Sequence, residues 1–83
     1  QFEDPDFYME GELIALATKA IHALPEEYRK AFEMNRFGHL TYNEIAERTG
    51  VSPKTIAYRI SQSLKILRTE LKDYMPLLIA LLH

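Results

Sequence analysis

Between residues 52 and 69 the chain carries four basic residues and no acidic residue. The basic residues are Lys54, Arg59, Lys65 and Arg68. Cationic side chains, together with the hydroxyl and amide groups among them, can donate hydrogen bonds to phosphate oxygens and to the edges of bases. A solvated helix surface has a similar composition. The two interpretations differ in how a helix would display these side chains.

One long helix of about 22 residues is predicted from Pro53 onward, because Ser52 is suited to the N-cap and no further proline occurs before Pro76. Residues at three- and four-residue spacing form its buried side: Ile56, Ile60, Ser63, Leu64, Leu67 and Leu71. At 100° per residue the opposite side is polar and free of acids. It holds Lys54, Tyr58, Ser61, Gln62 and Lys65, with Thr55 and Arg59 as flanks and Ala57 at its border.

A shorter helix is predicted immediately before it. Thr41 and Glu44 fit a capping box, which starts a helix at Thr41, and Gly50 can end it in the left-handed conformation. Ala46 is small where the two helices would cross. Two helices joined by a tight turn that contains glycine form a helix-turn-helix unit, whose second helix enters the major groove of DNA. Thr41, Tyr42 and Lys54 lie near helix N-termini and are candidates for phosphate contact.

Two further helices are predicted upstream. Apolar residues recur from Leu13 to Leu24 and indicate a helix over about residues 6–23, with Asp4 and Pro5 as its N-cap and first residue. Pro25 is placed as the first residue of the next helix, which Gly38 and His39 close. Its buried side is predicted to be Tyr28, Ala31, Phe32 and Met34. The predicted fold class is all-α, a four-helix helix-turn-helix DNA-binding domain with a long C-terminal recognition helix.

The 83 residues are expected to form a single domain, with residues 1–5 as a frayed linker end and residues 76–83 as an apolar tail. The first residue is Gln1, and we interpret the chain as a fragment or processed product. Without cysteine there is no disulfide and no thiolate metal site, so we expect the cytoplasm. The apolar tail is too short to span a membrane, and no membrane partner is expected.

Charge is divided unevenly along the chain. Residues 1–27 hold seven acidic residues and one basic residue, whereas residues 28–83 hold nine basic and five acidic ones, for charges of −6 and +4 within the net −2. This asymmetry is typical of a domain in which one face meets a polyanion. No constellation for catalysis accompanies it, since the three histidines lack metal-ligand spacing and Ser61 and Ser63 lack a neighbouring histidine and carboxylate. We therefore expect no enzyme, no cofactor and no metal.

From Leu24 to Leu71 the sequence resembles region 4 of bacterial sigma-70-type factors, in particular the extracytoplasmic-function group. The motifs that carry the resemblance are Leu24-Pro25-Glu26-Glu27-Tyr28-Arg29, Leu40-Thr41-Tyr42-Asn43-Glu44-Ile45-Ala46-Glu47-Arg48, Val51-Ser52-Pro53-Lys54-Thr55-Ile56 and Leu64-Lys65-Ile66-Leu67-Arg68. The resemblance implies recognition of the double-stranded minus-35 promoter element and attachment to the β-subunit flap of core RNA polymerase. An anti-sigma factor is a further possible partner, and we expect a monomer.

Carried over by position, the residues that read bases are Lys54, Thr55, Ala57, Tyr58, Arg59, Ser61 and Gln62. The predicted phosphate contacts combine residues that the resemblance implies with residues suggested by their positions on the helices. They are Asn35, Arg36, Thr41, Tyr42 and Lys65. Ala57 and Asn35 depart from the longer or basic side chains that the family often carries there. Two alternatives stay open: the DNA-binding domain of a LuxR-type response regulator, and a protein-interaction module that uses the first helix and the apolar tail.

Overall fold

The computed structural model describes residues 5–72, with side chains described from residue 11 onward. The secondary-structure elements of this part are helices joined by short connections: α1 (Pro5–His22), α2 (Glu26–Arg36), α3 (Tyr42–Thr49) and α4 (Pro53–Glu70). The predicted all-α class with four helices is confirmed. Residues 1–4 of the predicted linker end 1–5, the N-cap at Asp4 and the apolar tail lie outside the described residues, whereas Pro5 belongs to α1 as its first residue and not to a linker.

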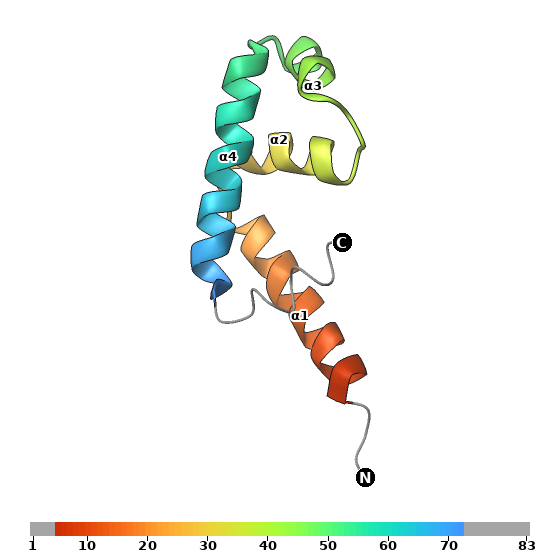
Figure 1. The fold of residues 1–83 in the computed structure, drawn as a ribbon. Coiled ribbons are helices and arrows are strands. Elements are labelled where there is room, and N and C mark those ends of the chain that lie inside the picture. Colours follow the sequence, from red (N-terminus) through yellow and green to blue (C-terminus); the bar gives the residue numbers. More distant parts are fainter. Residues whose placement is uncertain (1–4, 73–83) are drawn as a thin grey trace. The chain divides into compact units, whose positions relative to one another are not determined.

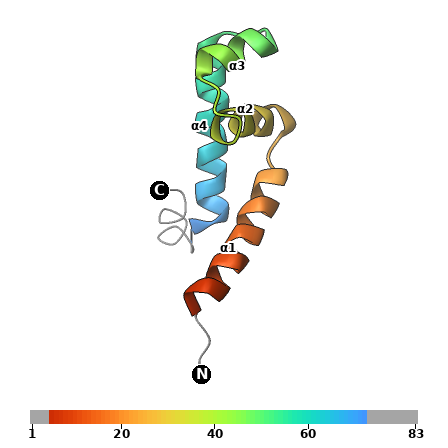
Figure 2. The same cartoon turned by 90° about the vertical axis from the view of Figure 1, so that its right-hand side faces the viewer.

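The chain divides into two compact units, and residues 24–66 form the one that contains the helix-turn-helix. Within this unit α2 crosses α4, and α3 lies beside the N-terminal end of α4 (Figures 1 and 2). The unit is closed around a buried apolar cluster, because each of its helices presents one apolar side inward. The cluster consists of Ala31, Ile45, Ala46, Ile56 and Ile60, against which Met34, Leu40, Val51 and Leu64 pack.

The second unit comprises residues 1–23 and 67–83, and its described part contains α1 and the end of α4. Leu13 and Leu71 are buried together at its centre. Leu16, Ala17 and Ala20 pack against this pair at the spacing that the sequence predicted for the buried side of α1. A few apolar contacts therefore hold the unit together.

The two ends of α3 have the predicted local chemistry. The Thr41 Oγ1 accepts a hydrogen bond from the Glu44 amide at 3.1 Å, and the Thr41 amide donates to the Glu44 carboxylate at 2.8 Å, which completes the capping box. Gly50 has φ 75° and ψ 25°, and its amide donates to the Ala46 carbonyl oxygen. The Ser52 Oγ then accepts from the Thr55 amide at 3.1 Å and caps α4.

Two predicted boundaries are wrong. Pro25 is the cap of α2 and not its first residue, since its ψ of 143° is extended while its carbonyl already accepts from the Arg29 amide. The long helix α4 has 18 residues instead of about 22. The prediction took Pro76 as the first helix breaker, whereas α4 ends at Glu70 and Leu71 follows in a turn.

Candidate nucleic-acid interface

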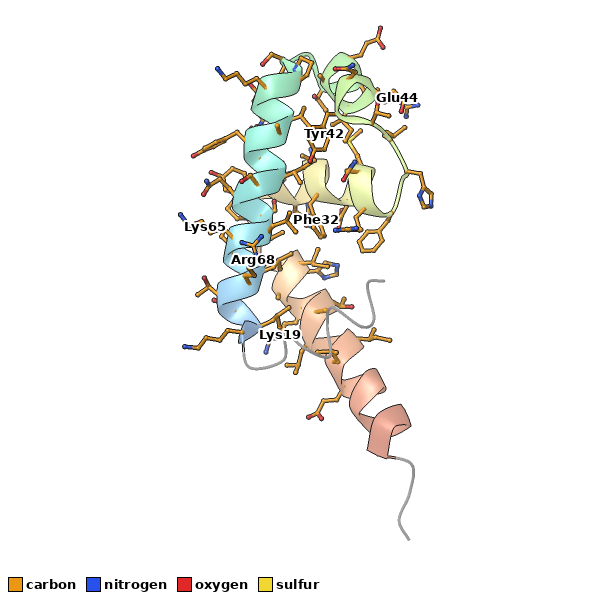
Figure 3. All side chains as sticks on the ribbon, in the orientation of Figure 1. Lys19, Phe32, Tyr42, Glu44, Lys65 and Arg68 are labelled. Carbon is orange, nitrogen blue, oxygen red and sulfur yellow. The ribbon has the colours of Figure 1, made fainter. Side chains whose placement is uncertain are left out.

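The polar side of α4 is open to solvent at its centre. Lys54, Tyr58, Ser61 and Lys65 are exposed, and the Tyr58 side chain retains 57% of its accessible area. Figure 3 shows Lys65 on the side of α4 that points away from α2 and α3. The opposite side is buried at Ile56, Ile60 and Ser63, as the periodicity predicted. A helix with this distribution can lie in a groove of a duplex without exposing its core.

The flanks of this polar side are half-buried: Thr55, Ala57, Arg59 and Gln62. Thr55 also contributes to the start of α4, where its hydroxyl lies 3.0 Å from that of Ser52. The structure thus places the seven predicted base-reading residues on one continuous surface with graded exposure. Lys54, Tyr58 and Ser61 are the exposed members of this surface.

Arg59 is held by α2. Its guanidinium lies 2.9 Å from the Glu27 carboxylate, and the Arg59 side chain is only 20% exposed, against 71% for Glu27. The pair lies beside a cavity of about 320 Å³. The cavity is lined by Glu27, Lys30, Ala31, Thr49, Val51, Ile56 and Arg59. One amino group of the Arg59 guanidinium is occupied by this carboxylate, so the predicted base contact must use the remaining N–H groups or compete with the ion pair.

Tyr58 also has a partner on α2. Its ring meets that of Tyr28 edge to face, with centroids 6.4 Å apart and planes at 83°. The pKa of the Tyr28 hydroxyl is raised above its ordinary value. The main cause is hydrogen bonding with the Tyr58 side chain, and partial burial is the second cause. The sequence analysis missed Glu27 and Tyr28 as neighbours of the recognition helix. No local signal could have found them, because their partners are distant in the sequence.

Four of the five predicted phosphate contacts lie at the end of α2 and around the start of α3, whereas Lys65 lies on α4. Asn35 is half-buried and donates from Nδ2 to the Leu40 carbonyl at 2.8 Å, which joins α2 to the loop before α3. Arg36, Thr41 and Tyr42 are exposed around this connection. The Thr41 amide and Oγ1 lone pair are used in the capping box, so the hydroxyl hydrogen is the group that Thr41 can offer to a phosphate. Asn35 is better placed to hold the loop than to reach outward.

These features define a helix-turn-helix DNA-binding domain with a polar, acid-free recognition surface. A scan of protein families matches residues 14–67 to sigma-70, region 4. The match covers more than half of the chain, which therefore belongs to the sigma-70 region 4 family, the DNA-binding domain with which sigma factors direct transcription initiation by RNA polymerase. Searches of curated proteins and of solved structures gave no match.

The family match confirms the resemblance to region 4 of sigma-70-type factors and decides between the helix-turn-helix alternatives in favour of a sigma factor. Region 4 binds DNA and is not a family of enzymes. In residues 5–72 no helix is long and apolar enough to cross a membrane.

Proposed function

We propose that this domain recognises the minus-35 element of promoters in a sigma factor of the extracytoplasmic-function group. α4 lies in the major groove, and the domain is attached to core RNA polymerase by the β-subunit flap. The observation that supports this most directly is the exposed, acid-free side of α4 that follows a correctly capped helix-turn-helix. A domain that works with RNA polymerase acts in the cytoplasm.

The residues divide into two roles. The exposed line from Lys54 to Ser61, with Gln62 and Arg59 at its flank, offers amide, hydroxyl, guanidinium and aromatic groups to base edges. Arg36, Thr41 and Tyr42 surround the loop before α3 and offer donors to phosphate oxygens, which orient the helix in the groove without reading sequence. Lys65, farther along α4, adds positive charge near the same backbone.

The test begins with selection of binding sites from random duplexes, with and without core RNA polymerase. We expect one motif to be enriched in both selections, and more strongly in the presence of polymerase, because a single module of this size binds weakly. Selection of a repeated motif bound by two copies of the chain, without any effect of polymerase, would contradict the proposal.

Fluorescence anisotropy on the selected duplex then tests the recognition surface. Gln62→Ala and Arg59→Ala should each weaken binding by about 1–3 kcal/mol with little loss of helix content. If about four phosphates are contacted, the affinity of the wild-type chain should fall roughly a hundredfold between about 50 and about 200 mM salt. Unchanged affinity in both variants would remove this side of α4 as the recognition surface.

A further inference from the structure

Tyr58 is an unusual feature of the recognition surface. It is a large aromatic side chain, more than half exposed, near the start of α4 and between the polar residues Lys54 and Ser61. Covering the apolar part of such a ring with another apolar group is favourable. In the major groove, the apolar group available for such a contact is the C5-methyl group of thymine.

The ring of Tyr58 is supported from α2. The edge-to-face contact with Tyr28 acts on the Tyr58 ring from its α2 side. This contact restricts the rotation of the Tyr58 side chain. The ring is therefore held in place before any duplex arrives.

Tyr28 is itself anchored to α4. Its carbonyl oxygen accepts a hydrogen bond from the Oγ of Ser63 at 3.1 Å, and Ser63 is fully buried. The preceding residue, Glu27, pairs with Arg59, the residue that follows Tyr58. Two consecutive residues of α2 thus hold two consecutive residues of α4, which fixes the register between the two helices at this point.

We propose that Tyr28 is a positioning residue that holds the ring of Tyr58 against the C5-methyl group of one thymine in the recognised duplex. The inference rests on the DNA-recognition function proposed above. Preorganisation is the physical gain, because a side chain that is already ordered loses less rotamer entropy on binding. Tyr58 makes the contact with the base, and Tyr28 acts through Tyr58.

The experiment uses the full 83-residue chain and the duplex obtained by selection. Each thymine is replaced in turn by deoxyuridine, which removes the methyl group and keeps the hydrogen-bonding groups. At one position the wild-type chain should lose affinity about fourfold, as expected for one buried methyl group. When the thymine at that position is replaced by 5-methylcytosine, the affinity should be higher than for the same duplex with unmethylated cytosine.

The variants separate reading from positioning. Tyr58→Ala should abolish the difference in affinity between thymine and deoxyuridine. Tyr28→Ala should reduce this difference to less than about twofold, while binding itself persists. Tyr28→Phe keeps the ring edge and should retain most of the difference. Tyr28→Leu preserves apolar volume without an aromatic edge and replaces Tyr28→Ala if circular dichroism shows that the alanine variant is unfolded.

Each failure has a distinct meaning. Full discrimination in Tyr28→Ala or Tyr28→Leu, with loss in Tyr58→Ala, would overturn the positioning role and leave promoter recognition intact. Equal discrimination in all variants would show that neither tyrosine reads the methyl group. A wild-type chain that selects no duplex would overturn the proposed function and this inference together.

Discussion

The Glu27 carboxylate and the Arg59 guanidinium, 2.9 Å apart, join the first turn of α2 to the middle of the recognition helix. The contact holds the Arg59 guanidinium against α2. A carboxylate next to DNA also repels phosphate. In the proposed complex Glu27 therefore opposes DNA binding in two ways, by holding Arg59 and by its own charge.

Glu27→Gln should raise the affinity for the selected duplex about three- to tenfold at low salt, because Arg59 is released and one negative charge is removed. The free energy of unfolding should fall by about 1 kcal/mol or less, since Glu27 is largely exposed. Anisotropy and urea denaturation measure the two effects.

Glu26→Gln is the matched control for this prediction. Glu26 is the neighbouring residue in the same first turn, and its carboxylate pairs at 3.3 Å with Lys30 on α2 itself. The substitution removes the same charge without releasing Arg59. An equal rise in affinity in both variants would attribute the effect to net charge alone and contradict the role of the Glu27–Arg59 pair.

Features that depend on neighbouring residues could be predicted from the sequence. The capping box of Thr41 and Glu44, the left-handed Gly50 and the cap at Ser52 each follow from side-chain and backbone chemistry within about four residues. The buried arc of α4 was predicted as well, because it follows from helical periodicity alone. These local features fix the helix-turn-helix and therefore the fold.

Features that depend on how α2 crosses α4 could not be predicted. The helical wheel placed Arg59 at the flank of the polar side, which is correct, but only the position of Glu27 decides that Arg59 is mostly covered. Similarly, the wheel placed Tyr58 at the exposed centre and gave no sign of Tyr28. The sequence likewise contained no sign that the Asn35 amide bonds to the Leu40 carbonyl oxygen.

Gly50→Ala should lower the free energy of unfolding by about 1–2 kcal/mol, because a residue with a Cβ is strained at φ 75°. Space is not the cause, since a Cβ at Gly50 would meet no atom within 4 Å. Gly11→Ala is the matched control: it also meets no atom within 4 Å, but in helix α1 it should stabilise by about 1 kcal/mol. Urea denaturation of the two variants should therefore give changes of opposite sign.

Gly38→Ala should also destabilise, for a different reason. A Cβ there would lie 2.7 Å from the Met34 carbonyl oxygen, and that oxygen accepts the hydrogen bond of the Leu40 amide. Relief of the clash requires a shift of the backbone that ends α2. We expect a loss of about 1–3 kcal/mol, the range for overpacking. A neutral Gly38→Ala variant in urea denaturation would show that this turn relaxes without cost.

The capping box makes stability depend on pH. The hydrogen bond from the Thr41 amide lowers the pKa of Glu44 below its usual value, so the folded state binds this proton less tightly than the unfolded state. The contribution is complete above the ordinary glutamate pKa of about 4.3 and is lost as the pH falls through the lowered pKa. Thermal unfolding at about pH 6 and about pH 3 should show a larger loss in the wild-type chain than in Glu44→Gln. Glu47→Gln, the same charge change in α3, should behave like the wild-type chain.

The last comparison is between Ser63 and Ser61, two serines of α4 that differ in burial. Ser63 is fully buried, and its hydroxyl lies within hydrogen-bond distance of the Tyr28 and Arg59 carbonyl oxygens, at 3.1 and 2.8 Å. Ser61 is exposed. Alanine raises helix propensity equally at both positions. Ser61→Ala should therefore be neutral or slightly stabilising, whereas Ser63→Ala should cost about 1 kcal/mol for the lost hydrogen bond between α4 and α2. Equal urea midpoints for the two variants would show that the Ser63 hydroxyl adds no stability to the contact between α2 and α4.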